Sequence, residues 1–215
     1  MIARVLGVVV TTIGLLGLIT VALTHVEIYE GVAAGLVLLT LLGACPLMLS
    51  IVGAKNDGAL DNASGVAAVL EAAAAIPASA RVGVLVTDAE ELGLAGARAW
   101  SRGRVPGIAL NCDSIDDIGQ LTAMYSTPAP SDLIARLRQA ALDNGEQLRV
   151  IRMIPGVLTD HVPLANAGWR TLTLSRGCLR TLGRVHSSRD TLQSMQGTGI
   201  AAAARILART ATELG

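Results

Sequence analysis

Two long uncharged stretches near the N-terminus constrain the fold of this chain more than any other feature. Residues 5–24 form a run of 20 residues without a charge, and residues 31–54 form a run of 24. A helix needs about 20 apolar residues to cross the hydrocarbon core of a bilayer. The turn between the runs contains Glu27, Tyr29 and Glu30, and tyrosine is enriched at membrane interfaces. The pattern predicts a transmembrane hairpin over residues 1–54, so that the protein is a multi-pass membrane protein with two spans and the lipid bilayer is a partner.

The flanking charges give an orientation for this hairpin. Arg4 and Lys55 lie on the same side of the predicted spans, and the connecting turn contains no lysine or arginine. The positive-inside rule therefore predicts that the remaining domain, residues 55–215, faces the cytoplasm. A pair of buried core helices is the alternative interpretation of the two runs. A cleaved signal peptide fits less well, because the second run follows at once and no cleavage site is evident.

The composition becomes that of a soluble domain from Asn56 onward, and expected strands alternate with expected helices. The short apolar runs that predict strands are residues 81–87, 105–111, 120–124, 148–153 and 169–174. The segments that predict helices are residues 66–75, 94–102, 132–142, 160–167 and 196–214. This alternation predicts an α/β fold with a mostly parallel central sheet flanked by helices.

The charge balance argues against a nucleic-acid partner. Lys+Arg and Asp+Glu both total 17, and the basic residues are scattered along the chain. Proteins that bind nucleic acids instead carry clustered basic residues, often with aromatic residues between them.

Acidic residues and one histidine stand at the ends of several expected elements. Glu90 and Glu91 follow the apolar run at 82–86, Asp61 lies in a glycine-rich loop before a helix, Asp113 ends a strand, and His186 lies in a late loop. Taken singly, an acid before a helix is usually a cap and a pair of glutamates after a strand is usually a solvated turn. A zinc site that hydrolyses amides needs such ligands, an open position for water, and a base to accept the proton of that water. The residues together predict a zinc site, with neighbouring Glu90 and Glu91 dividing the roles of base and ligand.

The local context of these residues resembles the M28 family of zinc aminopeptidases. The resemblance covers about residues 53–214 and follows the order of the family's motifs along the chain. The segments that carry it are GALDNASGVA at 58–67, DAEELGLAG at 88–96, NCD at 111–113, TDH at 159–161 and HSSRDTL at 186–192. The first two motifs are the most specific, and the match at Asp113 is looser.

This resemblance implies a role for each candidate residue. Asp61 would bridge two zinc ions, Glu91 and His186 would complete the shell of one ion, and Asp113 would bind the other. Glu90 would be the general base. The implied activity is a membrane-anchored, zinc-dependent aminopeptidase-type hydrolase that acts on the peptide bonds of a peptide substrate.

One expected element of the family pattern is missing. The family carries a His-x-Asp about a dozen residues before the bridging aspartate, and here that distance falls near Leu49-Ser50-Ile51, without a histidine. The domain is therefore expected to lack the N-terminal strands of the fold. An upstream fragment that supplies the missing His-x-Asp is a candidate partner. The motif residues Asp160 and His161 are expected to support the site rather than to ligate metal.

The missing ligand affects the expected metal content and activity. One zinc is expected at Asp61, Glu91 and His186, whereas a second ion held by Asp61 and Asp113 would be weak or absent. Activity is then impaired, or the chain is a catalytically inactive membrane protein with the M28 fold. A single-zinc enzyme similar to glutaminyl cyclases is the third alternative.

Overall fold

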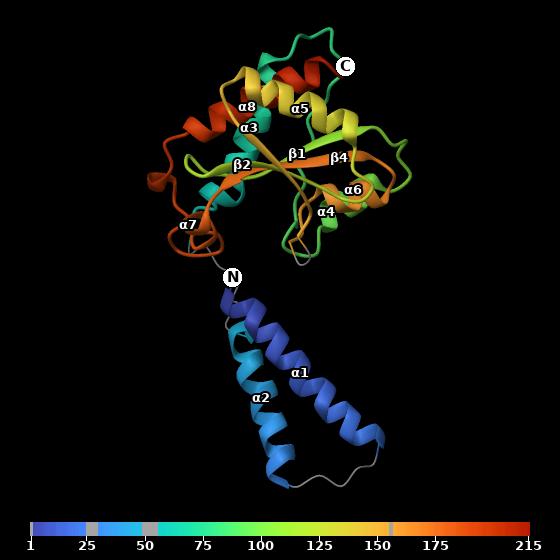
Figure 1. Cartoon of the computed structure of the whole chain (residues 1–215), viewed down its shortest axis with the longest axis vertical. Coiled ribbons are helices and arrows are strands. Elements are labelled where there is room, and N and C mark those ends of the chain that lie inside the picture. Colours follow the sequence, from blue (N-terminus) through green and yellow to red (C-terminus); the bar gives the residue numbers. More distant parts are fainter. Residues whose placement is uncertain (1, 25–29, 49–55, 155–156) are drawn as a thin grey trace. The chain divides into compact units, whose positions relative to one another are not determined.

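The chain folds into two compact units. The computed structural model describes residues 2–24, 30–48, 56–154 and 157–215. The two units are Met1–Lys55 and Asn56–Gly215. The first unit is a hairpin of helices α1 (Ile2–Thr24) and α2 (Glu30–Met48), which pack against each other (Figure 1). A Cβ atom at Gly14 would lie 2.3 Å from Thr40 Oγ1, so the missing side chain permits the close approach of the two helices.

The transmembrane prediction for this hairpin is not supported by the structure. Within the described residues, neither helix combines the length and the apolar character that a membrane span requires. The second uncharged run extends to residue 54, but α2 ends at Met48, and residues 49–54 lie outside the described part of the chain.

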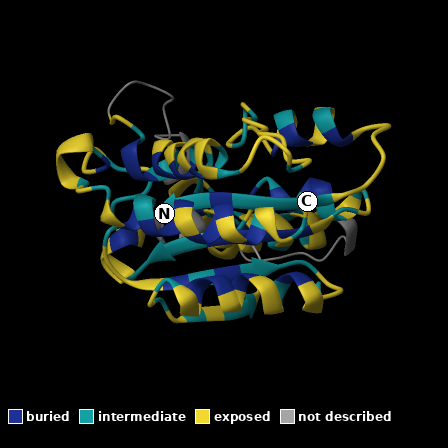
Figure 2. Cartoon of the chain, turned by 90° about the horizontal axis from the view of Figure 1, so that it is seen from above, coloured by how far each residue is buried: buried dark blue, intermediate teal, exposed yellow. Residues whose placement is uncertain are grey.

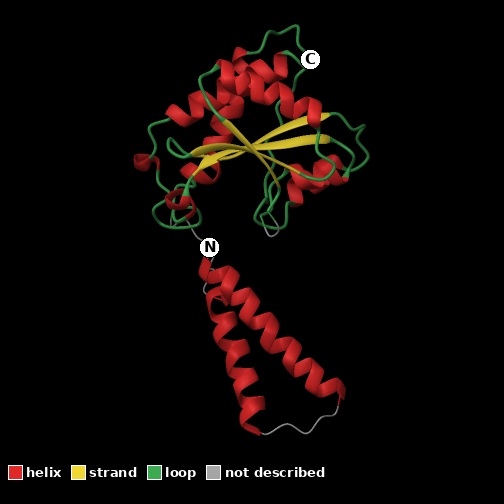
Figure 3. Cartoon of the chain, viewed as in Figure 1, coloured by secondary structure: helices red, strands yellow, loops and turns green. Residues whose placement is uncertain are grey.

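The second unit is built around a four-stranded mixed sheet. The strands, drawn in yellow in Figure 3, are β1 (Ile108–Ile115), β2 (Gln120–Tyr125), β3 (Leu148–Arg152) and β4 (Arg170–Gly177). They lie in the sheet in the order β1-β4-β2-β3. β1 pairs in parallel with β4, β2 pairs in parallel with β3, and β2 runs antiparallel to β4. Two of the three pairings are parallel, as expected, but the two parallel pairs run in opposite directions, so the sheet is mixed. A short turn without a crossover helix joins β1 to β2, so these two strands run in opposite directions.

Helices cover both faces of this sheet. Helices α3 (Ser64–Ala75), α5 (Ser131–Asp143) and α8 (Thr198–Thr212) lie on one face, and α4 (Ala95–Ser101) and α6 (His161–Asn166) lie on the other (Figure 1). The main core lies on the face of α3, α5 and α8, where Leu133, Leu137, Leu172, Leu174 and Ile206 are at most 1% exposed. Buried and exposed positions alternate along the flanking helices (Figure 2), as expected of amphipathic helices that cover a sheet.

Short elements occupy the loops at the end of the sheet where the candidate residues lie. They are η1 (Ala59–Ala63), which precedes α3, and α7 (Leu179–Leu182) and η2 (Leu192–Ser194), which lie between β4 and α8. The sequence predicted only that His186 lies in a late loop, and it did not predict the short helix α7 before this residue.

The predicted strand at residues 81–87 does not form. Among the described residues, no backbone hydrogen bond involves this segment, and it belongs to no sheet. Val82, Val84 and Val86 are 41%, 43% and 57% exposed. Apolar, β-branched residues favour a strand only where a neighbouring strand receives their backbone hydrogen bonds, and no described strand lies beside this segment.

Candidate metal centre

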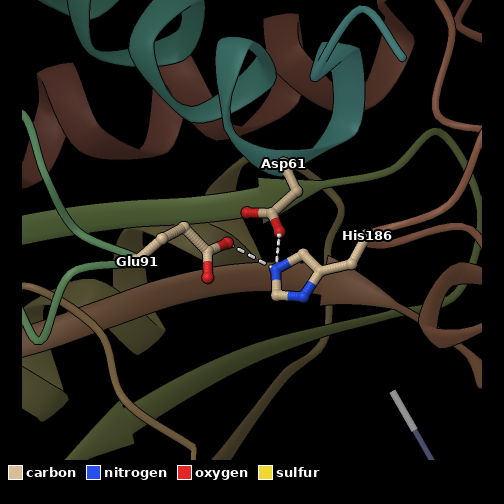
Figure 4. Close-up of side chains that lie close together, drawn as sticks. All are labelled: Asp61, Glu91 and His186. Carbon is tan, nitrogen blue, oxygen red and sulfur yellow. Dashed lines mark ion pairs between the residues drawn. The ribbon is translucent and has the colours of Figure 1, made fainter. Parts of the chain in front are cut away.

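Three side chains from distant parts of the chain converge at one point. His186 Nε2 lies 2.9 Å from Asp61 Oδ2 and 2.5 Å from Glu91 Oε1 (Figure 4). One ligand atom from each residue lies within 4.8 Å of the other two. Zinc accepts imidazole nitrogen and carboxylate oxygen at about 2.0–2.2 Å, and catalytic zinc uses three protein ligands with a fourth position open. One imidazole and two carboxylates at this spacing fit such a site.

A buried carboxylate fixes the loop that carries Asp61. Asp190 is 1% exposed, and its two oxygens accept hydrogen bonds from the backbone N–H groups of Leu60 at 2.6 Å and Asp61 at 3.0 Å. The backbone N–H of Asp190 donates to the carbonyl of Ser187 at 3.1 Å, in the turn that follows His186. Asp190 therefore ties together the two loops that carry Asp61 and His186.

Asn62 attaches the start of α3 to β1. Its Oδ1 accepts hydrogen bonds from the N–H groups of Gly65 and Ser114 at 3.0 and 3.1 Å, and its Nδ2 donates to the carbonyl of Cys112 at 3.1 Å. A Cβ atom at Gly65 would lie 2.3 Å from the Cys112 carbonyl oxygen, so only glycine allows this close packing. The contact sets the Asp61 loop beside Asp113.

A largely buried ion pair anchors the loop that carries His186. Arg184 Nη1 lies 3.1 Å from Asp116 Oδ1, and the two side chains are 17% and 3% exposed. Thr181 Oγ1 donates a second hydrogen bond to Asp116 at 2.7 Å. His186 itself has a φ of 57°, a left-handed conformation that costs a non-glycine residue about 1–2 kcal/mol. The surrounding contacts of the loop hold it in this conformation.

Glu91 is the least enclosed member of the group. Its side chain is 65% exposed, against 18% for Asp61 and 30% for His186. It lies in the turn before α4, which is closed by hydrogen bonds from Leu94 N to the Glu90 carbonyl at 2.8 Å and from Gly96 N to the Asp88 carbonyl at 3.2 Å. These bonds hold the turn but leave the Glu91 carboxylate free to adjust.

Further carboxylates surround the three donors. Glu90, Asp113 and Asp160 line the same cavity as Asp61 and Glu91. Burial, followed by repulsion from the neighbouring carboxylates of which Asp113 is the strongest, raises the pKa of Glu90 to about 7. Burial and then the charge of Asp61 raise the pKa of Asp113 to about 7. Burial also raises the pKa of Asp160. The site therefore concentrates negative charge that a cation would stabilise.

The remaining predicted residues lie near the three donors but do not join them. Asp113 lines the shared cavity yet is outside the three-residue group that the described residues form. Asp160 accepts a hydrogen bond from Thr87 Oγ1, which ties α6 to the segment before Glu90.

His161 lies in the protein interior. It is 0% exposed, and its Nδ1 lies 2.7 Å from Thr159 Oγ1 while its Nε2 lies 3.0 Å from Ser126 Oγ. Burial lowers its pKa to about 4, so the ring is neutral near pH 7. His161 Nδ1 also lies 2.6 Å from Thr173 Oγ1 of β4, a contact that connects α6 to the sheet, so His161 has a structural position.

Sequence reasoning missed the residues that position the ligands. Asp190 was recognised only as part of the motif that begins at His186, and no positioning role was predicted for it. The contacts of Asp116 and Arg184 were not predicted. For Asp190, the signal was an acid four residues after a candidate ligand within a recognised motif. Nothing in the local sequence shows that Asp116 is buried, because its partners lie 65 and 68 positions away.

The fold and the donor set define the class to which this protein belongs. In this α/β domain an imidazole and two carboxylates converge beside a carboxylate of raised pKa, and this donor set suits a zinc ion. The family model that describes peptidase family M28 matches residues 48–211. The chain belongs to the M28 peptidase family.

Solved zinc aminopeptidases share this fold. The zinc aminopeptidase BSAP from Bacillus subtilis matches with a TM-score of 0.64 at 21% identity, covering 75% of this chain and 43% of that one. An aminopeptidase from Aneurinibacillus sp. strain AM-1 matches with a TM-score of 0.61 at 20% identity, covering 75% and 41%. The LapA aminopeptidase of Legionella pneumophila gives 0.62 at 17% identity, covering 76% and 48%. This chain thus spans less than half the length of each of these structures. Among curated proteins, no relative matches it.

Proposed function

We propose that this protein is a zinc-dependent hydrolase of peptide bonds with aminopeptidase-type specificity. The observation that carries the proposal is the convergence of Asp61, Glu91 and His186 within 4.8 Å, since these residues are far apart in the sequence. Membership in the M28 family and the fold shared with zinc aminopeptidases support the same reaction class.

The three donors would hold the zinc ion. Zinc, when bound, lowers the pKa of water and polarises a carbonyl group. Asp61 and His186 lie on loops that Asp190 fixes to each other, so they offer a preformed pair of ligands. Glu91 completes the set from a more exposed turn.

Glu90 would accept the proton from the attacking water and transfer it to the leaving amine. It lines the same cavity as Asp61 and Glu91, and it follows directly on from the Thr87 segment that is tied to Asp160. A general base is most effective when its pKa lies near the working pH. The pKa of Glu90, raised to about 7 by burial and by the neighbouring acids, meets that condition.

The surplus of carboxylates supports action at the amino end of a peptide. Asp113 and Asp160 lie in the same cavity, and among the described residues Arg81 is the only lysine or arginine that lines it. A protonated α-amino group would be attracted to this cluster, whereas a C-terminal carboxylate would be repelled. The substrate class we propose is therefore a peptide with a free N-terminus.

The proposal is tested by hydrolysis of aminoacyl-p-nitroanilides together with zinc content. Glu90→Gln should retain zinc and lower kcat by about 10²–10⁴-fold, the usual contribution of a general base. Glu71→Gln, on the exposed side of α3, is the matched control and should leave both properties unchanged. Equal turnover by Glu90→Gln and the unmodified protein would exclude Glu90 as the base.

The zinc content also separates the alternatives. We expect one zinc per chain, because Asp113 stands outside the three-donor group. A folded protein that binds no zinc would be the inactive relative of the family. A single-zinc protein that cyclises N-terminal glutaminyl peptides but does not release amino acids would be a cyclase. The observation that favours this function is the donor set of one imidazole and two carboxylates.

Attachment to a lipid bilayer is a separate proposal that rests on the first unit. Large apolar side chains are exposed along both helices, including Ile13, Leu16, Leu41 and Leu42 at 56%, 58%, 59% and 62%. Close helix contact at a glycine, as at Gly14, is typical of helix pairs in membranes. The full-length protein should remain with membranes after carbonate extraction. Protease treatment of sealed vesicles would test the expected cytoplasmic side for the second unit.

A further inference from the structure

A cavity in the second unit lies between two segments of the backbone. Its volume is about 880 Å³. Residues 81–87 line one side, and residues 107–113, which include most of β1, line the other. Acids of the metal centre, including Asp61 and Glu90, line the same cavity. We call this cavity the slot.

Both walls of the slot have unpaired backbone groups. The only described strand that pairs with β1 is β4, so the opposite edge of β1 has no ladder. Across the slot, no described residue forms a backbone hydrogen bond with residues 81–87. In the β1 wall the Cys112 carbonyl already accepts a hydrogen bond from Asn62 Nδ2. Apart from such side-chain bonds, two facing segments without a ladder between them are what remains when a strand is removed from the interior of a sheet.

The slot is apolar toward both layers of helices. Val69 of α3 and Leu207 of α8 line it on one side of the sheet, and Trp100 of α4, Leu164 of α6 and the nearby Trp169 line it from the other. An edge strand needs only one apolar face, whereas a strand in the interior of an α/β sheet is apolar on both. The lining therefore suits an interior strand.

We propose that the slot receives one extended strand donated by a separate polypeptide. That strand would pair with β1 on one side and with residues 81–87 on the other, and would convert residues 81–87 into a sheet strand. The mode of recognition is β-strand addition, in which main-chain hydrogen bonds supply affinity and side-chain pockets supply specificity.

Other occupants fit the slot less well. Its volume is within the range of about 300–1,000 Å³ found for small-molecule pockets, so volume alone does not decide. A small ligand, however, would leave both rows of backbone groups unpaired. A second copy of this chain has no spare strand among its described residues, because β1 to β4 are all in the sheet and residues 81–87 form a wall of the slot.

The chemistry of the donated segment follows from the walls. It spans about seven residues, or about 23 Å at 3.3 Å per residue. It is apolar on both faces and contains no proline, because each of its amides has a partner on one side or the other. The solved aminopeptidases are more than twice as long as the region that this chain matches.

The test uses the full-length protein in mild detergent and an acetylated, amidated peptide. The peptide has five alternating valine and isoleucine residues between lysine pairs, and its control has proline at the central position. The acetyl group removes the free N-terminus, so binding is measured independently of the proposed peptidase activity. Hydrogen exchange and tryptophan fluorescence are the readouts, because Trp100 and Trp169 are the only tryptophans of the chain and both line the slot.

The strand peptide should slow exchange by about tenfold or more at amides of residues 81–87 and β1 and should shift tryptophan emission, and the proline peptide should do neither. Val84→Pro should abolish both effects without changing the free protein, because residue 84 has no backbone partner to lose. Val105→Pro, at an 87% exposed position outside the slot, is the matched control and should bind normally.

Three results would overturn the proposal. The first is the absence of protection at millimolar peptide. The second is slow exchange of residues 81–87 in the protein alone, which would mean that this chain or a second copy already fills the slot. Dependence on protein concentration would identify the second copy. The third is equal binding of the strand and proline peptides, which would show general apolar adsorption.

Discussion

Asp190→Asn should weaken zinc binding even though Asp190 is not one of the three converging donors. The carboxylate of Asp190 accepts hydrogen bonds from Leu60 N and Asp61 N, and an asparagine amide can accept only one of them. The other backbone N–H then faces the side-chain amino group of the asparagine. Because Asp190 is only 1% exposed, water cannot replace the lost hydrogen bond. An unsatisfied buried donor costs about 1–3 kcal/mol. Residues that orient metal ligands typically change metal affinity by about 10–100-fold.

The assay is a zinc titration against a competing chelator, run beside thermal unfolding. Asp117→Asn provides the matched control, because Asp117 also accepts backbone hydrogen bonds, from Gln196 and Gly199 at 2.6 and 3.0 Å, but lies away from the donors at the start of α8. Both variants should be less stable, and only Asp190→Asn should lose zinc affinity. Equal zinc affinity in the two variants would refute the positioning role of Asp190.

Three further outcomes follow from the structure. In the metal-free protein, Glu90 and Asp113 have folded-state pKa values of about 7, above their unfolded values, so the free energy of unfolding should fall as pH rises from about 4 through 7. Thermal unfolding at pH 5 and pH 8 measures this change. A higher stability at pH 8 than at pH 5 would contradict it. Removing zinc from the loaded protein should lower its unfolding free energy by about 2.7 kcal/mol relative to zinc at 100 times its Kd, seen in chemical denaturation with and without chelator. Gly65→Ala should destabilise the domain by about 1–3 kcal/mol, because the added Cβ would meet backbone atoms. Gly83→Ala is the control and should not, because a Cβ there has nothing within 4 Å. Equal unfolding midpoints for the two variants would show that the backbone around Gly65 can move to accept the methyl group.

Local sequence predicted much of the second unit because its elements are locally encoded. The helix expected at 132–142 appears as Ser131–Asp143, and the strand expected at 120–124 appears as Gln120–Tyr125. The candidate ligands were recognised because their motifs place acids and a histidine in loops that follow or precede such elements. Asp61, Glu91 and His186 then meet in space, although their roles at the metal remain proposals.

The parts that sequence could not predict depend on partners outside each segment. Residues 81–87 have the composition of an interior strand, but a strand forms only where another strand accepts its hydrogen bonds, and none is described there. The direction of β2 depends on the short connection after β1 and on the insertion of β4 between them. The importance of Asp190 arises from contacts across 129 and 130 positions, which no local pattern reveals.

The zinc site and the slot should be thermodynamically coupled through the segment that carries Glu91. Asp61 and His186 are fixed to each other through Asp190. Glu91 instead follows residues 81–87, which have no described backbone partner and are attached to Asp160 by a hydrogen bond from the Thr87 side chain. A strand in the slot would hold residues 81–87 in one conformation, so zinc binding would no longer have to order this segment before the Glu91 turn. Ordering a few residues costs about 1–2 kcal/mol each, so the strand peptide should tighten zinc binding by about tenfold or more. Linkage requires zinc to tighten peptide binding by the same factor, and titrations in both orders measure the two factors. Peptide binding that protects residues 81–87 while leaving zinc affinity unchanged would show that the Glu91 turn is already rigid without its neighbouring strand.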